Sequence, residues 1–249
     1  MAGQDEEALP APAGGREDGA PPRTPTLAED LLLLLFQPGS GRRAGAGSIA
    51  GEGTLYYVLA GAVLAQLGLE GRVRTGTGRA RSTVAAVAGD PPVDHLLRRT
   101  WDYVAGTPRG VQDVLAAMGP GLREPLLDRL VGRGDLRLGV RTRFAVLRTS
   151  ALEEGDTGRR GGLIADVRAV LVEGAEPTAR SAALAALLHA SGTLPQFDRE
   201  IPWIAPVIAR AEELTAGVLG ADAAAEAVAR TVAATIVNSV AAAVVRARG

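Results

Sequence analysis

The chain has 249 residues, 47% of them hydrophobic, which is enough for one large domain or two small ones with a buried core. Its 27 basic and 28 acidic residues leave a formal net charge of −1. This balance excludes an overall field that draws the protein to nucleic acid or anionic lipid, so any anion site must be local. The sequence has no cysteine, which excludes disulfides, thiolate nucleophiles and cysteine-ligated zinc and suits a reducing interior.

Residues 1–25 are rich in proline, glycine, alanine and acidic side chains. They lack the basic start and the apolar run of a signal peptide, and their composition is typical of a disordered tail. We therefore expect a tail over residues 1–25 and a folded domain over residues 26–249.

The first predicted helix begins at Thr26. Its hydroxyl can accept a hydrogen bond from the backbone N–H three residues on while the Glu29 side chain reaches back, which is the reciprocal arrangement of a capping box. Glu29 and Asp30 also place negative charge at the positive end of a helix dipole. An apolar run over residues 31–36 continues the helix, and glycine and proline in residues 37–41 end it.

The second predicted helix, over residues 55–69, is apolar nearly all round. A helix without a polar face is expected at the centre of a protein, where other elements cover every side. It ends at residues 70–72, with Gly71 as the expected left-handed cap. Residues 37–53, which precede this helix, are rich in glycine and are predicted to form a loop.

The rest of the chain predicts further helices and little sheet. Short strands are expected at residues 72–74 and 82–88, and alternating polar and apolar residues predict a β-hairpin at 135–147. Further helices are expected at residues 93–104, 111–118, 122–132, 163–171, 177–191, 201–214 and 221–246. The expected fold class is mainly α, a helical bundle around a central apolar helix with a small β-hairpin portion.

Residues 231–245 are the best candidate for a membrane span. The segment is shorter than the ~20 apolar residues that a bilayer requires, consists mostly of alanine and contains Asn238. We therefore predict a buried helix there. The two tryptophans, Trp101 and Trp203, are predicted to anchor the core, with a lipid-facing position as the alternative for Trp203.

Three segments carry a pattern beyond composition: TLAEDLLLL at residues 26–34, AGAVLAQLGLEGRV at 60–73 and ALAALLHASG at 183–192. Together, and in this order, they resemble the Golgi phosphoprotein 3 family, with Gln66 in place of the usual glutamate. The resemblance extends over roughly residues 25–245.

The resemblance implies a mainly helical fold and binding at a membrane surface rather than catalysis. Family members bind phosphatidylinositol 4-phosphate through arginines that converge on the phosphate, with an apolar element that enters the lipid layer. They also hold the cytosolic tails of membrane enzymes. The implied partners are therefore an anionic lipid or phosphoinositide headgroup and such tails. The implied location is cytoplasmic, peripheral at the cytosolic face of a membrane.

Matching the family's lipid-binding positions to this chain leaves one arginine. The family's Trp, its helix arginine and its arginine pair fall, in that order, near Gly51 and at Ala60, Pro120 and Arg123. The resemblance therefore assigns the headgroup to Arg123. The alternative is a solvated arginine on a helix face that pairs with Glu124 or Asp128.

The hairpin supplies the second half of the implied mechanism, an apolar tip that enters the bilayer or binds a neighbouring subunit in a homo-oligomer. The candidate wedge residues are Phe144, Val146 and Leu147, and the candidate basic fringe is Arg141, Arg143 and Arg148. Each arginine near an anionic surface contributes about 1 kcal/mol of attraction. The alternative is a half-buried strand in which Phe144 and Val146 pack on helices while the arginines face water.

Catalytic, metal and cofactor sites are not predicted. His189 lies in a run of alanine and leucine and is expected to be a packing residue. His95 follows Asp94 directly, and adjacent residues of a helix do not face one another. With two distant histidines and no cysteine, a zinc site is unfavourable, and the glycine-rich segments fit neither a phosphate loop nor a dinucleotide fingerprint. We therefore predict that the chain is not an enzyme.

Two functions from different classes remain. The first is a peripheral membrane protein that recognises a phosphoinositide or another anionic lipid through Arg123 and the hairpin and acts as an adaptor for membrane enzymes. The second is a soluble protein-interaction module that keeps the fold without the lipid site. The loss of three of the four matched positions supports the second.

Overall fold

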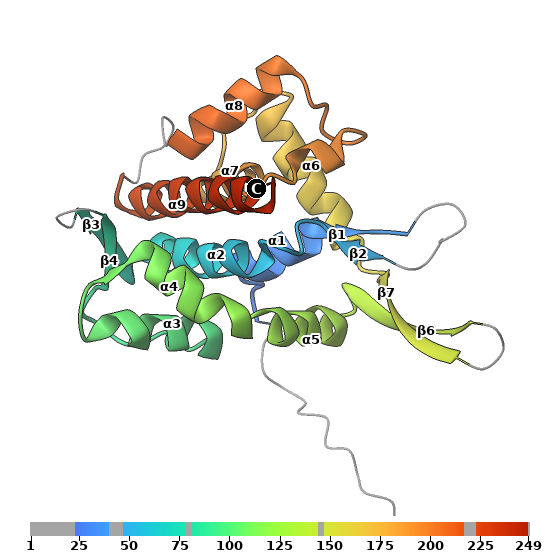
Figure 1. The fold of residues 1–249 in the computed structure, drawn as a ribbon, viewed down its shortest axis with the longest axis horizontal. Helices are drawn as coiled ribbons and strands as arrows, with labels where there is room; N and C mark the ends of the chain where they lie inside the picture. Colours follow the sequence, from blue (N-terminus) through green and yellow to red (C-terminus); the bar gives the residue numbers. More distant parts are fainter. Residues whose placement is uncertain (1–22, 40–46, 78–80, 144–146, 217–222, 249) are drawn as a thin grey trace, which may run out of the picture.

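The computed structural model describes residues 23–39, 47–77, 81–143, 147–216 and 223–248. Within these ranges, nine α-helices surround a continuous hydrophobic core and three small antiparallel sheets lie at its edges (Figure 1). The predicted mainly α class with a small β portion is confirmed.

The described helices are, in chain order, α1 (Leu27–Leu35), α2 (Leu55–Leu69), α3 (His95–Ala105), α4 (Val111–Met118), α5 (Arg123–Arg133), α6 (Arg159–Leu171), α7 (Ala179–Ala190), α8 (Ala205–Ala216) and α9 (Ala223–Arg248), with 3-10 turns η2 (Gly119–Gly121) and η3 (Leu194–Phe197). The described strands are β1 (Phe36–Gln37), β2 (Ser48–Ile49), β3 (Val73–Thr77), β4 (Ser82–Ala86), β5 (Arg109–Gly110), β6 (Leu136–Arg143) and β7 (Leu147–Glu154). The helices predicted at residues 55–69 and 111–118 have those bounds.

Helix α1 is an internal helix. The predicted capping box is present, with the Thr26 side chain accepting from the Glu29 backbone and the Glu29 side chain accepting from the Thr26 backbone. Every residue of α1 is buried, including Glu29 and Asp30. The helix therefore carries two carboxylates into the interior, where they need positively charged partners.

Helix α2 is the central element that its sequence predicts. It packs against α1, α3, α4, α7 and α9, and Figure 1 shows it between α9 on one side and α3 and α4 on the other. Gly71, just beyond its end, has φ +66°, as predicted for a left-handed cap.

Two glycines of α2 set its distance from α9. A Cβ at Gly61 would lie 2.6 Å from Ile236 Cδ1, and one at Gly68 would lie 2.6 Å from Val228 Cβ. Val228, Val232 and Ile236 of α9 are themselves buried. Residues of the segment considered as a membrane span thus pack into the core, and no helix of the described residues is both long and apolar enough to cross a bilayer.

Replacing Gly68 by alanine should lower the free energy of unfolding by about 1–3 kcal/mol, because the added methyl group overpacks the α2–α9 contact. Gly132→Ala in α5 is the matched control, since a Cβ there meets nothing within 4 Å. That exchange should stabilise the protein by about 0.5–1 kcal/mol through helix propensity. Urea denaturation of both variants measures the two changes in the free energy of unfolding. If Gly68→Ala stabilised the protein as much as Gly132→Ala, the close packing of α2 on α9 would be contradicted.

The small strands around α1 and α2 were only partly predicted. Residues 37–53 were predicted as a loop, yet Phe36 pairs with Ile49 and Gln37 with Ser48 in a short β1–β2 ladder. Two-residue strands are too short to show a period in the sequence. Strands β3, β4 and β5 form the second sheet in that order.

The β6–β7 hairpin projects from the helical body (Figure 1). It is paired from Leu136 and Glu154 at its base to Arg143 and Leu147 near its tip. The hairpin was predicted over residues 135–147, but this range holds β6 and only the first residue of β7. Residues 148–150 are all polar, so the alternation that indicated a strand stopped before β7 ended.

Candidate functional site

Arg123, the predicted headgroup residue, is paired with two carboxylates. At the start of α5 its Nη1 donates to Glu124 Oε1 at 2.7 Å and its Nη2 donates to Glu52 Oε1 at 3.1 Å. Burial alone would lower the pKa of Arg123, but these two carboxylates outweigh it and raise the pKa above its ordinary value. The pairing with Glu124 matches the alternative of a helix-face arginine. Glu52 lies next to Gly51, the position matched to the family's tryptophan.

The predicted hairpin residues lie at the far end of β6–β7. Arg141 and Arg143 belong to β6 and Leu147 begins β7, while Phe144 and Val146 lie outside the described residues. At the base of the hairpin, the Leu138 side chain is exposed and Arg137 pairs with Glu153 and Asp156. Arg123 and the hairpin adjoin opposite ends of α5, so the structure does not bring them into one pocket.

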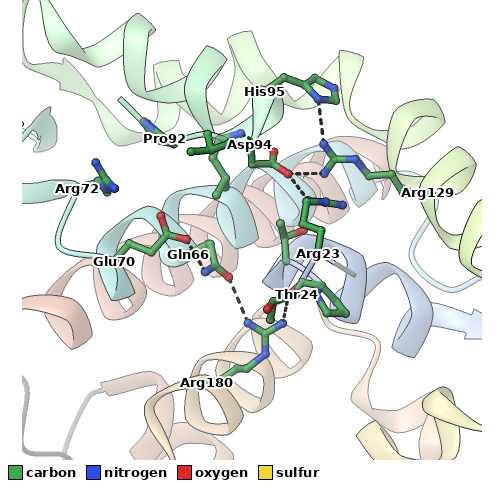
Figure 2. Close-up of a pocket in the computed structure, with 14 residues that line it drawn as sticks. Arg23, Thr24, Gln66, Glu70, Arg72, Pro92, Asp94, His95, Arg129 and Arg180 are labelled. Carbon is green, nitrogen blue, oxygen red and sulfur yellow. Dashed lines mark hydrogen bonds and ion pairs between the residues drawn. The ribbon is translucent and has the colours of Figure 1, made fainter. Parts of the chain in front are cut away.

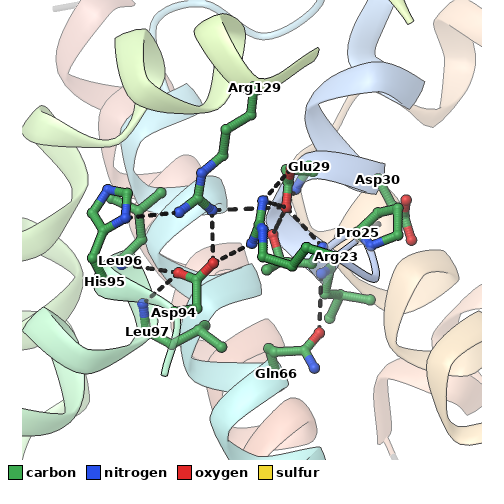
Figure 3. A network of polar contacts seen from close by, with 12 residues as sticks. Arg23, Pro25, Glu29, Asp30, Gln66, Asp94, His95, Leu96, Leu97 and Arg129 are labelled. Atoms are coloured by element: carbon green, nitrogen blue, oxygen red, sulfur yellow. Dashed lines mark hydrogen bonds and ion pairs between the residues drawn. The ribbon is translucent and has the colours of Figure 1, made fainter. Parts of the chain in front are cut away.

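A charged network that the sequence did not predict surrounds α1 (Figure 3). At its centre, Glu29 has no exposed surface. Its carboxylate accepts from Thr26 N at 2.8 Å, Arg23 Nη2 at 2.9 Å and Arg133 Nη2 at 2.5 Å, and Arg129 Nη1 lies 3.8 Å away. Burial alone would raise the pKa of Glu29, but the bonds from Thr26 and Arg133 and the charge of Arg23 hold it below its ordinary value.

Asp94 links this centre to α3. It caps the helix by accepting from the backbone N–H groups of Leu96 and Leu97, at 2.9 and 3.2 Å. Arg129 Nη1 lies 3.0 Å from its Oδ2, and Arg23 also pairs with it. Burial works against the charge, but the bonds from Arg129 and Leu97 lower the pKa of Asp94 below its ordinary value. Figure 3 shows the guanidinium of Arg23 between the two carboxylates.

The network continues to α6 and α7 through Asp30 and Asp135. Arg159 pairs with Asp30 and donates to Asp135 at 2.6 Å, and Arg180 Nε donates to Asp30 at 2.9 Å. In total, five arginines (Arg23, Arg129, Arg133, Arg159 and Arg180) contact four carboxylates (Glu29, Asp30, Asp94 and Asp135). Five positive charges against four negative ones leave an excess of one.

A cavity of about 540 Å³ lies beside the network (Figure 2). Its polar lining includes Gln66 and Glu70 from the end of α2, Arg72, Arg180 and His95. His95 Nδ1 lies 3.0 Å from Arg129 Nη2. Because arginine can only donate, that histidine nitrogen is the acceptor. Arg180 Nη1 donates to Gln66 Oε1 at 3.3 Å, so polar groups of the wall are bonded to one another.

A second cavity, of about 610 Å³, is lined by Arg23, Thr24, Pro25, Arg129, Gly132 and Arg133. The first four of these residues line both cavities. The segment Arg23–Pro25, which we call the strap, therefore forms a wall common to the two. The lining of the second cavity includes three arginines and no carboxylate.

The sequence did contain a signal for this network. Two carboxylates, Glu29 and Asp30, lie in a helix whose other residues are all alanine or leucine. A helix that is buried on every side cannot leave such groups in water, so each must find a cationic partner. The sequence interpretation assigned Glu29 to the capping box and both carboxylates to the helix dipole, without distant partners.

The family model for Golgi phosphoprotein 3 (GPP34) matches residues 27–235, most of the chain. The chain belongs to the Golgi phosphoprotein 3 family. No curated protein sequence matches it. The family assignment confirms the resemblance drawn from the segments at residues 26–34, 60–73 and 183–192. The Golgi phosphoprotein 3 family is not a family of enzymes.

Two other sequence predictions can be compared with the structure of this Golgi phosphoprotein 3 family member. Burial lowers the pKa of His189, which is consistent with a packing role. The core-anchor prediction is wrong for Trp203, which is 37% exposed beside the more exposed Ile204, because the segment that enters α8 lies on the surface. Trp101 is partly buried against the core, and its Nε1 donates to the Arg72 carbonyl at 3.2 Å.

Proposed function

We propose that this protein binds peripherally to membranes that contain anionic lipid, with the β6–β7 hairpin as its contact element. The projection of the hairpin from the helical body carries the proposal (Figure 1). Among the described residues its sheet consists of β6 and β7, and no other described strand pairs with it. Residues 140–149 contain three arginines and no acidic residue, and they include the predicted apolar wedge at Phe144, Val146 and Leu147.

The register supports a basic face on this hairpin. Alternate positions of a strand lie on the same face, so Arg141 and Arg143 share one. Arginines near an anionic surface contribute about 1 kcal/mol each, so the three of the distal hairpin supply about 3 kcal/mol. Attraction of this size supports reversible binding, to which an apolar wedge would add.

The family resemblance extends this proposal to an adaptor role at the cytosolic face of a membrane. In such a role the helical body holds the cytosolic tails of membrane enzymes while the hairpin holds the lipid. Binding to phosphatidylinositol 4-phosphate without binding to phosphatidylglycerol would identify a phosphoinositide as the preferred lipid.

A soluble protein-interaction module is the second candidate, and the pairing of Arg123 favours it. A phosphate headgroup at Arg123 would have to compete with Glu52 and Glu124, at 3.1 and 2.7 Å. Since the other three matched positions carry no arginine or tryptophan, this end of α5 offers a headgroup little free charge. The hairpin would then bind a protein rather than a lipid.

Vesicle flotation at low salt separates the two candidates. The protein should float with vesicles of phosphatidylinositol 4-phosphate or phosphatidylglycerol and not with neutral phosphatidylcholine. Removing both arginines of the basic face (Arg141→Ala with Arg143→Ala) should weaken binding about thirtyfold, because each arginine contributes about 1 kcal/mol of attraction to the anionic surface. Phe144→Asp should also weaken it, whereas Arg123→Ala should have little effect because two carboxylates already hold that charge.

Arg98→Ala is the matched control, since this exposed arginine of α3 pairs loosely with Asp102 at 3.9 Å. It should leave flotation unchanged. If folded wild-type protein ignores every anionic vesicle at low salt, where screening is weakest, the membrane proposal is wrong and the interaction module takes its place.

A further inference from the structure

We propose that the second cavity, between the strap and α5, is a binding site for a phosphate monoester or a comparable dianion. We call it the strap cavity. It is lined by Arg23, Thr24, Pro25, Arg129, Gly132 and Arg133. The ligand could be a soluble phosphate compound or the phosphate of a lipid headgroup, since the chemistry that holds the group is the same.

The charge of the lining points to an anion. The three arginine side chains remain partly exposed, at 42% for Arg23, 15% for Arg129 and 27% for Arg133. Glu29 contacts all three of them yet has no exposed surface itself. It therefore orients the arginines without occupying the cavity, and the surrounding network keeps its excess of one positive charge.

Two of these arginines have donors to spare. A guanidinium carries five N–H donors. Arg129 engages His95 and Asp94, and Arg133 engages Glu29 and Asp135, so each keeps further N–H groups for a ligand. The Nη1 atoms of both are buried without a hydrogen-bond partner among the described residues. They lie in ion-pair contact with Asp94 at 3.0 Å and with Asp135 at 3.5 Å.

The rest of the lining suits a phosphate group. Arg129 and Arg133 are four residues apart on α5, so they share one face of the helix. Gly132 lies between them, and a Cβ there would meet nothing within 4 Å, so a ligand can approach the helix backbone. Thr24 is exposed at the opposite wall and adds a hydroxyl donor.

A dianion with several oxygens matches this arrangement better than a single carboxylate. One carboxylate engages one guanidinium fork, whereas a phosphate presents oxygens to three arginines and a hydroxyl at once. The site is separate from Arg123, which lies at the other end of α5, and from the hairpin tip. The inference therefore does not depend on the proposed membrane role.

Isothermal titration of the full chain, in a buffer free of phosphate and sulfate, tests the site. Inorganic phosphate and glycerol 3-phosphate are the soluble probes, and phosphatidylinositol 4-phosphate vesicles are the lipid probe. We expect saturable binding of at least one probe, weakened about tenfold or more by Arg133→Gln. The matched control Arg123→Gln, at the other end of the same helix, should leave binding unchanged.

Because Arg133 also bonds to Glu29, a second variant keeps the buried network whole. Thr24→Asp adds a negative charge to the exposed strap and should weaken binding by a similar factor without removing any partner of Glu29. Binding of the soluble probes identifies a soluble phosphate compound. Binding of the vesicles alone identifies a headgroup at this site only if Thr24→Asp weakens it, because the hairpin is also proposed to bind vesicles.

The proposal is overturned if no probe binds to folded wild-type protein, or if Arg133→Gln and Thr24→Asp bind as wild type does. Weakening by Arg123→Gln to the same extent would overturn it as well. Phe144→Asp separates the strap cavity from the hairpin: it should weaken vesicle binding by the hairpin and leave titration with soluble phosphate unchanged.

Discussion

Replacing Glu29 by alanine should lower the free energy of unfolding by about 3–5 kcal/mol, the cost of breaking a buried ion pair from one side. Glu29 is completely buried, and its carboxylate accepts hydrogen bonds from Arg23 and Arg133. Without it, these guanidiniums keep their charge but lose their common partner. The change also removes the capping bond to Thr26 N. Urea denaturation followed by circular dichroism measures the loss.

The matched control is Glu124→Ala, because Glu124 also pairs with an arginine but its side chain is 75% exposed. A surface pair of this kind contributes about 1 kcal/mol or less, since water already solvates both charges. A result in which the two variants lose the same small amount of stability would mean that the network around α1 does not act as a buried ion cluster. The free energy of unfolding of most small domains is about 5–15 kcal/mol, so the loss expected for Glu29→Ala is a large share of it.

The elements predicted well from sequence are those with local signals. The capping box at Thr26 needs only residues three apart, and α2 is defined by an unbroken apolar run that ends at Gly71. The central position of α2 follows from the same run, because a helix without a polar face must be covered on every side. These signals are complete within one helix, so no knowledge of the fold is needed to use them.

The charged network could not be predicted in the same way, because its partners are distant in the chain. Glu29 meets Arg133, 104 residues on, and Asp30 meets Arg180, 150 residues on. The sequence can show that a buried carboxylate needs a cation, but only the packing of α1 against α5, α6 and α7 selects which arginine supplies it. The strap cavity is a product of that packing.

The candidate lipid site likewise has one part that the sequence predicted and one part that it did not. The match of residues to the family predicted that only Arg123 remained, and the alternative interpretation named Glu124 or Asp128 as its partner, of which Glu124 is the one observed. Glu52, which comes from the segment before α2, was not foreseen, because 71 residues separate it from Arg123. The structure adds a second group of arginines at the other end of α5, at positions that the family comparison did not single out.

The stability that Glu29 provides should depend on pH, and comparison with Glu29→Gln isolates this dependence. Bonds to Thr26 and Arg133 outweigh burial and hold the pKa of Glu29 below its ordinary 4.5 in the folded protein. A carboxyl group with a lowered folded pKa stabilises the protein above the unfolded value and loses that contribution as the pH falls through the folded one. We therefore expect wild type to exceed Glu29→Gln in stability at about pH 7, and the difference to shrink below about pH 4.5.

Other titrating groups affect both proteins alike, which is why the difference is the quantity to measure. Burial lowers the pKa of His189 from its ordinary 6.5, so protonation of the unfolded state lowers stability below that pH in wild type and variant together. Asp94, whose pKa is also lowered, remains in both proteins, although its partners Arg23 and Arg129 also contact Glu29. Urea denaturation of the two proteins between about pH 3 and about pH 7 gives the difference directly. A difference that stays constant over this range would show that Glu29 has the same pKa in the folded and unfolded protein, so that the surrounding arginines do not favour its charged form.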